Sequence, residues 1–427
     1  MRRKLIGTLA VGVSVACSLL AAESGKAPPR SPSEAGAEVV LSGAGLGYAQ
    51  PLGPRGFLLR DPGSMLSPRL QTARFQSAST PVPTVVNMAG GQRQLSALNP
   101  EISLTGDFAA WLRFPEFPSD PAPAVYGPGL GNRFFLREAE LHIVAPLDPY
   151  TRGKFLFGLS GEGDFHLGEA YMEWVSLPGN LNLKIGKYRN QFGLLNRWHE
   201  HALPQVDRPL VLTSFFGEEG LAGMGVSADW LLPRLWAHVN QLTVELISGG
   251  DGVSFAEEGR RDRVAVGHLK SYWDVTDDAY LELGWSAAAG NNDADGRFRT
   301  WLGGLDLTYK WVPAERSLYR AFEFRSEWLA SWRQTPAGRV RSWGAFASVQ
   351  NRCGVHWWAG IRLDYTHLPD DASAVWKAGS IVLTYWQSEF VFFRLQLQRT
   401  LCTPGADLTR VALQVVWSMG PHKHEAY

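Results

Sequence analysis

The chain has 427 residues, 41 basic and 41 acidic side chains, and 12% aromatic residues that include 17 tryptophans. Its formal net charge of zero argues against a broad basic surface, and therefore against nucleic acid as a non-specific partner. No run of 18 apolar residues occurs, which excludes a helical membrane protein, and the length fits two or three ordinary domains or one large all-β barrel.

The first residues are typical of an export signal. The basic residues from Arg2 to Lys4 precede an apolar stretch over 5–16, which is too short to span a bilayer as a helix. We expect residues 1–22 to be a signal peptide, the alternative being a short buried helix. The signal implies an extracytoplasmic destination.

Residues 23–98 are rich in Pro, Gly, Ser and Ala and show weak periodicity. This composition predicts a largely flexible periplasmic lead-in. From residue 99 to 427 short segments with a period of two follow one another, separated by turn-forming clusters. The predicted strands are 102–113, 133–145, 152–160, 167–176, 180–188, 221–230, 236–248, 262–273, 279–289, 299–311, 320–333, 339–350, 354–367, 374–386, 389–400 and 407–418.

The two faces of these segments differ in polarity, and this difference indicates what surrounds each face. In "RVALQVVW" (410–417), one face carries Val, Leu, Val and Trp, and the other carries Arg, Ala, Gln and Val. A soluble sandwich explains a few such strands, because a second sheet covers the apolar face. Sixteen in series behind an export signal favour lipid contact on the apolar face and a polar lumen.

We therefore predict an all-β fold, a transmembrane antiparallel up-and-down β-barrel of about sixteen strands with a low-complexity N-terminal segment. Each segment is about as long as a tilted strand that crosses the hydrocarbon layer, which needs about 9–11 residues. The lipid bilayer of the bacterial outer membrane is the expected partner and location. A soluble secreted all-β binding domain is the competing fold, and it would need no detergent.

Several stretches resemble a group of bacterial outer-membrane porins that is similar to the phosphate-selective porin O and P family. They are "LNPEISLTGDF" (98–108), "FFLREAELHIVAPLDPY" (134–150), "GEAYMEWVSLPGNLNLKIGKYRNQFG" (168–193) and "LNRWHEHALPQVDRPLVLTSFFGEEGL" (195–221). The resemblance covers about residues 98–427 and is most specific over 134–221. It implies a sixteen-stranded outer-membrane barrel that acts as a passive diffusion channel and forms a homotrimer.

In that family a Gly-Lys strand end leads into a long loop, and this motif maps onto Gly186, Lys187, Tyr188, Arg189, Phe192 and Gly193. The loop over 189–220 is the longest irregular stretch of the barrel region, and long loops in compact folds are usually functional. We expect it to narrow the pore, the alternative being a loop at a subunit interface or outside the barrel. The candidate constriction residues are Arg189, Arg197, His199, His201 and Arg208.

The inward faces carry charges of both signs. The expected pore-lining residues are Glu138, Glu140, Glu169, Glu173, Lys184, Glu245, Lys310, Glu323, Arg325, Arg362, Asp364, Arg394 and Arg410. Acids dominate the earlier strands and cations are commoner in the later ones, which predicts weak selectivity. Arg362, Arg394 and Arg410 are the candidates for anion contact, unless they pair with nearby acids. A ladder of stacked arginines is missing from the pattern, which counts against phosphate specificity.

Other chemistry is weakly supported. His199 and His201 share a face, as do His422 and His424, but a metal site would need a third and a fourth ligand from elsewhere. We therefore predict no metal and no cofactor. The chain lacks a Gly-x-Ser-x-Gly elbow, and acidic ladders in a wet pore need no catalytic explanation, so an enzyme is not expected. Whether Cys353 and Cys402 form a disulfide is left open.

These features together predict an outer-membrane porin, a water-filled channel for passive diffusion of small hydrophilic solutes or ions. The competing function is a non-channel barrel that binds a ligand or a metal as a receptor or scaffold.

Overall fold

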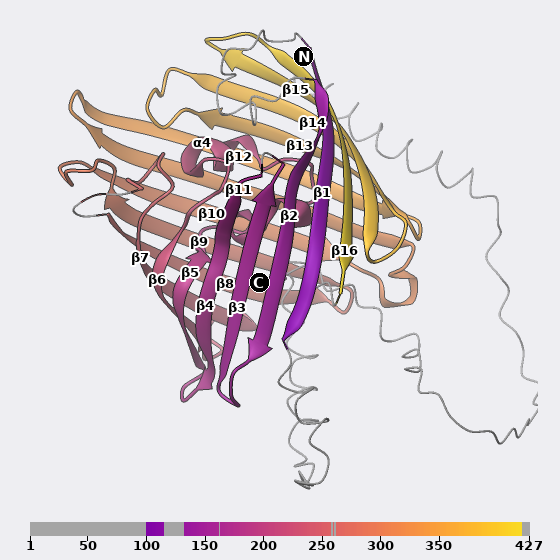
Figure 1. The fold of residues 1–427 in the computed structure, drawn as a ribbon, viewed down its shortest axis with the longest axis horizontal. Coiled ribbons are helices and arrows are strands. Elements are labelled where there is room, and N and C mark those ends of the chain that lie inside the picture. The colour runs from indigo at the N-terminus through magenta and orange to yellow at the C-terminus, as the bar shows by residue number, and fades with distance from the viewer. Residues whose placement is uncertain (1–99, 115–131, 162, 258, 260–261, 421–427) are drawn as a thin grey trace, which may run out of the picture.

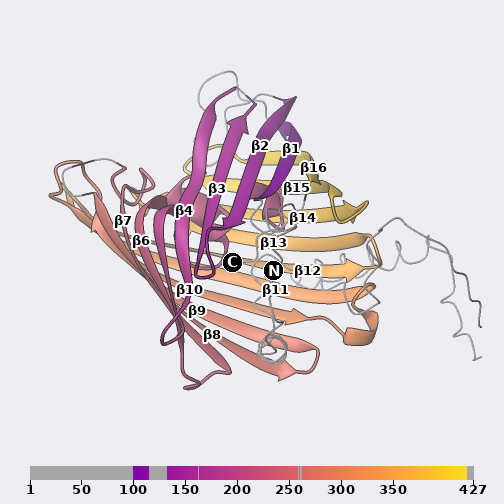
Figure 2. The ribbon, with the colours of Figure 1, turned by 60° about the horizontal axis from the view of Figure 1, so that its bottom comes forward.

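The computed structural model describes residues 100–114, 132–161, 163–257, 259 and 262–420. The sixteen strands of this part of the chain form one closed antiparallel barrel, in which each strand pairs with its neighbours in sequence and β1 pairs with β16 (Figure 1). The predicted fold class is confirmed. In the turned view, β1 to β4 lie in front of the wall that contains β9 to β13 (Figure 2).

The strand bounds follow the period-two segments closely. The strands are β1 Glu101–Phe114, β2 Arg133–Pro146, β3 Thr151–Ser160, β4 Phe165–Leu177, β5 Leu181–Arg189, β6 Ala222–Leu232, β7 Val239–Ser248, β8 Arg263–Thr276, β9 Ala279–Asn291, β10 Arg299–Trp311, β11 Arg320–Thr335, β12 Gly338–Cys353, β13 Trp357–His367, β14 Val375–Trp386, β15 Val391–Thr403 and β16 Leu408–Met419. Every predicted segment overlaps one of them.

The largest differences are at turns. β13 begins at Trp357 instead of residue 354, because Gly354 has a φ of 145° and belongs to the turn after β12. That backbone region is open to glycine and rarely to other residues. β7 begins at Val239 instead of residue 236. The expected signal peptide, the lead-in over 23–98, and His422 and His424 lie outside the described residues.

The strands place their polar face inside the barrel. Along β15, Arg394 and Gln396 are buried, whereas Leu395 and Leu397 are each 48% exposed. In β16 the inward side chains of the 410–417 segment are those of Arg410, Ala412, Gln414 and Val416. An exposed apolar face on a closed sheet matches the pattern of barrels whose outer wall contacts lipid.

The two rims differ in the length of their connections. The connection from β5 to β6 holds the 3-10 helices η2 (Leu195–Arg197) and η3 (Glu200–Ala202) and the helix α4 (Leu210–Phe216). α4 packs against β12, β13 and β14. Within the described residues, no helix is long and apolar enough to cross a membrane.

Cys353 and Cys402 do not bridge each other. Cys353 is the last residue of β12 and pairs with Arg320. It lies at the rim opposite the connection from β5 to β6, which we call the rim of short turns. Cys402 lies near the end of β15, at the same rim as that connection, and pairs with Trp376. A disulfide requires Cα atoms about 4.4–6.8 Å apart, and a whole strand length separates these two.

Candidate functional site: the loop inside the barrel

The chain between β5 and β6 forms a closed loop over 190–221, which we call the inner loop. At its base the backbone N–H of Asn190 donates to Leu221 O over 3.0 Å. The Asn196 side chain completes the closure: Nδ2 donates to the carbonyls of Asn190 and Leu221, and Oδ1 accepts the N–H of Leu221 over 2.8 Å. The loop is therefore a compact unit held by its own hydrogen bonds.

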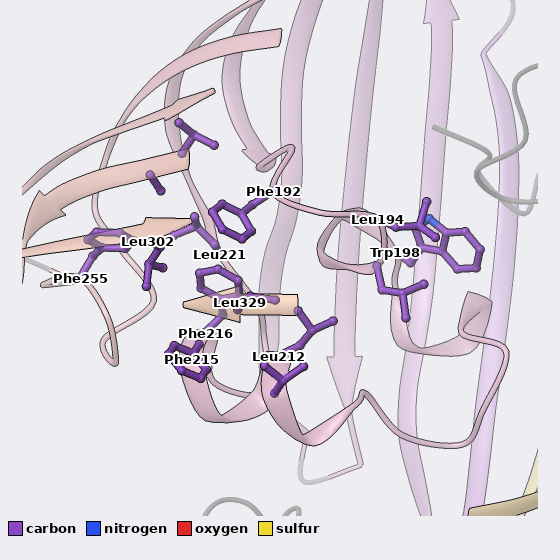
Figure 3. Packing of buried hydrophobic residues seen from close by; sticks show 14 of the residues in the cluster. Phe192, Leu194, Trp198, Leu212, Phe215, Phe216, Leu221, Phe255, Leu302 and Leu329 are labelled. Carbon is purple, nitrogen blue, oxygen red and sulfur yellow. The ribbon is translucent and has the colours of Figure 1, made fainter. Parts of the chain in front are cut away.

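Apolar packing fixes one side of the inner loop against the barrel wall. Phe192, Phe215 and Phe216 are at most 1% exposed, and they lie with inward apolar residues of the strands from β7 to β12 in one cluster (Figure 3). The wall residues of this cluster are Ile247, Val264, Val266, Ala288, Leu302, Leu329 and Phe346. Burial of this size stabilises the loop, because each fully buried large apolar side chain contributes about 1.5–3 kcal/mol. These residues of the inner loop therefore lie against the inner face of the barrel.

Polar side chains of the barrel wall form hydrogen bonds with backbone groups of the inner loop. The Glu245 carboxylate accepts the N–H of Gln191 over 3.0 Å, and the Glu327 carboxylate accepts the N–H of Leu195 over 2.8 Å. Further contacts of this kind join Gly193 to Ser286, Pro204 to Gln350, Val206 to Gln396 and Leu210 to Asp364. The loop backbone thus finds partners on β7, β9, β11, β12, β13 and β15, which satisfies groups that burial would otherwise leave unpaired.

Asp207 is the main electrostatic anchor of the inner loop. Its carboxylate pairs with Arg362 Nη2 over 2.9 Å, pairs with Arg410, and accepts the Gln396 amide over 2.7 Å. Burial favours the neutral acid, but the Arg362 and Arg410 guanidiniums outweigh it and hold the pKa of Asp207 below its ordinary value. One carboxylate therefore joins β13, β15 and β16 to the loop.

These pairs change the interpretation of two expected anion contacts. Arg362 is fully buried and also pairs with Asp364 over 2.8 Å, and Arg410 pairs with Asp207, so both guanidiniums are engaged in ion pairs. Arg394 donates to Gln205 O and to the side chains of Gln414 and Thr384. Among the described residues, Arg394 has no carboxylate within salt-bridge distance, unlike Arg362 and Arg410.

A second anchor is a buried cluster of histidines and carboxylates. Glu140 and His142 face inward on β2, and His199 and His201 come from the inner loop; all four are at most 7% exposed. Glu140 Oε2 lies 2.9 Å from His142 Nε2 and 3.1 Å from His201 Nδ1, and Glu140 Oε1 lies 3.3 Å from His199 Nδ1. The sequence analysis named Glu140 as pore-lining and paired His199 with His201, but it did not single out His142 or bring these residues together.

Charge is balanced around this cluster by neighbours on the wall. Glu169 on β4 lies 3.7 Å from His199 Nε2 and pairs with Lys154 on β3. Burial lowers the pKa of His199, but the carboxylates of Glu140 and Glu169 outweigh burial and raise it to about 9. At neutral pH His199 is therefore cationic and lies between two carboxylates.

The other expected site residues also point inward and have partners. The Glu173 carboxylate is 2.6 Å from Arg152, that of Glu138 is 3.1 Å from His166, and the Lys184 ammonium lies 4.6 Å from the ring centre of Tyr171. Glu323 pairs with Arg325 and with Lys310 at 3.7 Å. Of the loop set, Arg189 contacts Glu219 and Arg197 contacts Gln191, while Arg208 donates to the carbonyls of Leu195 and Trp198. Burial and the nearby Arg189 charge lower the pKa of Arg208 to about 10.

A cavity of about 370 Å³ lies between the inner loop and the rim of short turns. Its loop side is formed by residues from Trp198 to Pro204, and its wall carries four cationic side chains, two acids and several aromatic rings. The charged residues are Lys310, Glu323, Arg325, Arg352, Glu389 and Arg394. The cavity therefore has a largely apolar lining that also carries charges of both signs, and His201 is one of its lining residues.

Comparison with known proteins places the fold but no family. No family model matches the chain. An uncharacterized protein of Aquifex aeolicus is 32% identical over 308 residues, which are 62% of this chain and 62% of that protein. The chain thus spans less than two thirds of that relative's length.

Solved structures resemble the chain in architecture alone. The anion-selective porin from Comamonas acidovorans has a TM-score of 0.50 at 10% identity, and the match covers 75% of this chain and 99% of the porin. The outer-membrane channel DcaP of Acinetobacter baumannii has a TM-score of 0.49 at 10% identity, with 75% and 97% covered. The chain shares the barrel architecture of the Comamonas protein.

Proposed function

We propose that this protein is an outer-membrane channel through which small hydrophilic solutes or ions diffuse passively, and that the inner loop narrows it. The observation that carries the proposal is a closed barrel with a polar inner face and an apolar outer face, in which the connection from β5 to β6 folds inward. Such a wall needs a lipid bilayer outside and water inside. The bacterial outer membrane is the bilayer in which closed barrels of this type reside.

Weak ion selectivity is part of the proposal. Acids gather on β2, β4 and β7, and most cations come from β10 to β16, yet many of these charges pair within the wall or with the loop. Paired charges of opposite sign leave a small net field, whereas strong selectivity needs a ring of one sign. For the same reason the proposal does not extend to phosphate specificity, since Arg362 and Arg410 are engaged by Asp207.

The solute route includes the cavity below the inner loop. Its charged groups and aromatic rings suit small amphipathic molecules that have both polar and apolar parts. Catalysis has no part in this proposal. A homotrimer is included on the strength of the sequence resemblance, and cross-linking followed by native mass measurement tests it.

Single-channel recording tests the function. Purified protein in planar bilayers is compared with a variant that lacks residues 195–215 and with a control that lacks residues 293–297 of the connection between β9 and β10. We expect discrete conductance steps for the intact protein, larger steps without the inner-loop segment, and unchanged steps in the control. Reversal potentials under a salt gradient should be small.

The result also separates the two candidate functions. A folded protein that inserts into bilayers and yet gives no steps in either the intact or the shortened form would contradict the channel. That outcome would favour the alternative, a barrel that binds a ligand or a metal as a receptor or scaffold. Strong selectivity of either sign would contradict the paired-charge argument.

A further inference from the structure

The buried cluster on β2 and the inner loop has the composition of a metal centre. Glu140, His142 and His201 each offer one ligand atom, and the three atoms lie within 4.8 Å of one another. Imidazole nitrogen and carboxylate oxygen are the donors that Zn²⁺ and related divalent ions take in proteins. The three residues come from two segments about sixty positions apart in the chain, so the fold alone assembles them.

The distances are close to those of a coordination shell. In tetrahedral zinc sites with bonds of about 2.0–2.2 Å, neighbouring ligand atoms lie roughly 3.4 Å apart. Glu140 Oε2 lies 2.9 Å from His142 Nε2 and 3.1 Å from His201 Nδ1. Two of the three separations are therefore within about half an ångström of such a shell, and the third is no longer than 4.8 Å.

One atom of the cluster lacks the hydrogen bond that its burial calls for. Glu140 is 1% exposed, and among the described residues its Oε1 has no hydrogen-bond partner; His199 Nδ1 lies 3.3 Å away in an ion-pair contact. A buried carboxylate oxygen without such a partner is costly. The ion-pair contact with His199 offsets that cost for Oε1, and it leaves Oε2, which lies between His142 and His201, as the ligand atom. His199 would then orient the ligand carboxylate, as outer-shell groups commonly do.

An ion can also reach the cluster. His201 lines the cavity of about 370 Å³ below the inner loop, so one ligand of the cluster borders an open space. Glu140 and Glu169 bring two carboxylates, and Lys154 pairs with one of them. The cluster itself offers one carboxylate oxygen of Glu140 and one imidazole nitrogen each from His142 and His201.

We propose that Glu140, His142 and His201 bind one divalent transition-metal ion of the Zn²⁺ class, which ties the inner loop to β2. The site goes beyond the channel function and does not depend on it. The bound ion acts as a removable cross-link between the wall and the segment 199–201. With the ion present, the segment 199–201 is joined to β2 by metal–ligand bonds. Without the ion, only hydrogen bonds and ion pairs join them.

The test measures binding directly. Full-length protein in detergent micelles, stripped with a chelator, is titrated with ZnCl₂ by calorimetry, and bound metal is counted by elemental analysis. We expect one Zn²⁺ per barrel with micromolar affinity or tighter. His142→Gln and His201→Gln should each weaken binding at least 100-fold, whereas His268→Gln, which changes a buried histidine on β8, should bind as the unmodified protein does.

Two further measurements keep the test decisive. Co²⁺ added to the unmodified protein should give the intense visible bands of a four-coordinate site, which needs no variant to fold. His422→Gln with His424→Gln should leave the site intact. The proposal is overturned by absence of binding, by unchanged affinity in the two cluster variants, by an octahedral Co²⁺ spectrum, or by loss of binding in the tail variant.

The readouts separate this proposal from the channel. A protein that binds Zn²⁺ through the cluster and passes no current would contradict the channel and leave the metal site standing. A protein that conducts and binds no Zn²⁺ would contradict the metal site alone. Hydrogen exchange of the amides over 199–203 should slow when Zn²⁺ is added to the unmodified protein, and an unchanged rate would contradict the cross-link.

Discussion

Replacement of Asp207 by Asn tests whether one carboxylate holds the inner loop to the wall. The change keeps an acceptor oxygen and removes the charge between Arg362 and Arg410. Breaking a buried ion pair by removing one partner costs about 3–5 kcal/mol. Here Arg362 keeps Asp364 and Arg410 keeps Gln398, so we expect the lower end, about 3 kcal/mol, or roughly 150-fold in the local opening of the loop.

Hydrogen exchange of the Val206 and Leu210 amides measures this opening, because both amides donate to wall side chains. Asp407→Asn is the matched control: its pair with Arg399 is 2.9 Å long but exposed, and such pairs contribute about 0–1 kcal/mol. We expect faster exchange at both amides in D207N and no change in D407N. If the two variants exchanged at the same rate, Asp207 would not be the anchor and the electrostatic account of the loop would fail.

Three other outcomes follow from the same contacts. Because the folded-state pKa of Asp207 is depressed, its contribution is present above the ordinary pKa of 3.8 and is lost as pH falls below that value; loop opening in the unmodified protein should therefore rise below pH 3.8, and a flat profile would contradict this. Leu395→Arg places a charge on the outward face in mid-strand and should cost about 2–4 kcal/mol in unfolding measured in lipid vesicles, whereas Leu235→Arg in the turn before β7 should cost little; equal costs would argue against lipid contact. Gly193→Ala puts a Cβ 2.2 Å from the Glu327 carboxylate at a φ of 62°, so we expect a loss of about 2 kcal/mol in loop stability by amide exchange, and no loss would show that this carboxylate can move aside.

Much of the barrel was accessible from the sequence because period-two alternation is a local property. The alternation within each strand shows which side chains face inward, and the thickness of the hydrocarbon layer sets the strand length. The positions of sixteen strands could therefore be predicted to within a few residues. The long connection after Arg189 was also visible as a break in that alternation. The inward face of "RVALQVVW" was correct for the same reason.

The partners across the lumen could not be read in this way. Asp207 is the one acidic residue between Glu200 and Glu218, but the sequence analysis did not single it out. Nothing local indicated that Arg362 and Arg410 would meet there. Those guanidiniums lie more than 150 positions away along the chain. Their meeting depends on how the sheet closes and where the loop enters, both of which are properties of the whole barrel.

The histidine cluster, too, could be predicted from the sequence only in part. Alternation placed Glu140 beside His142 on one inward face, and the spacing of His199 and His201 placed both on one side of an extended segment. Only the folded loop brought the two pairs within reach, because the packing of Phe192 and its neighbours against β7 to β12 decides where the rest of the loop lies. The sequence by itself determined the wall and its two faces, since these follow from side-chain alternation and strand length. The tertiary structure decided which groups face one another across the interior, since that depends on closure of the sheet and on contacts far apart in the chain.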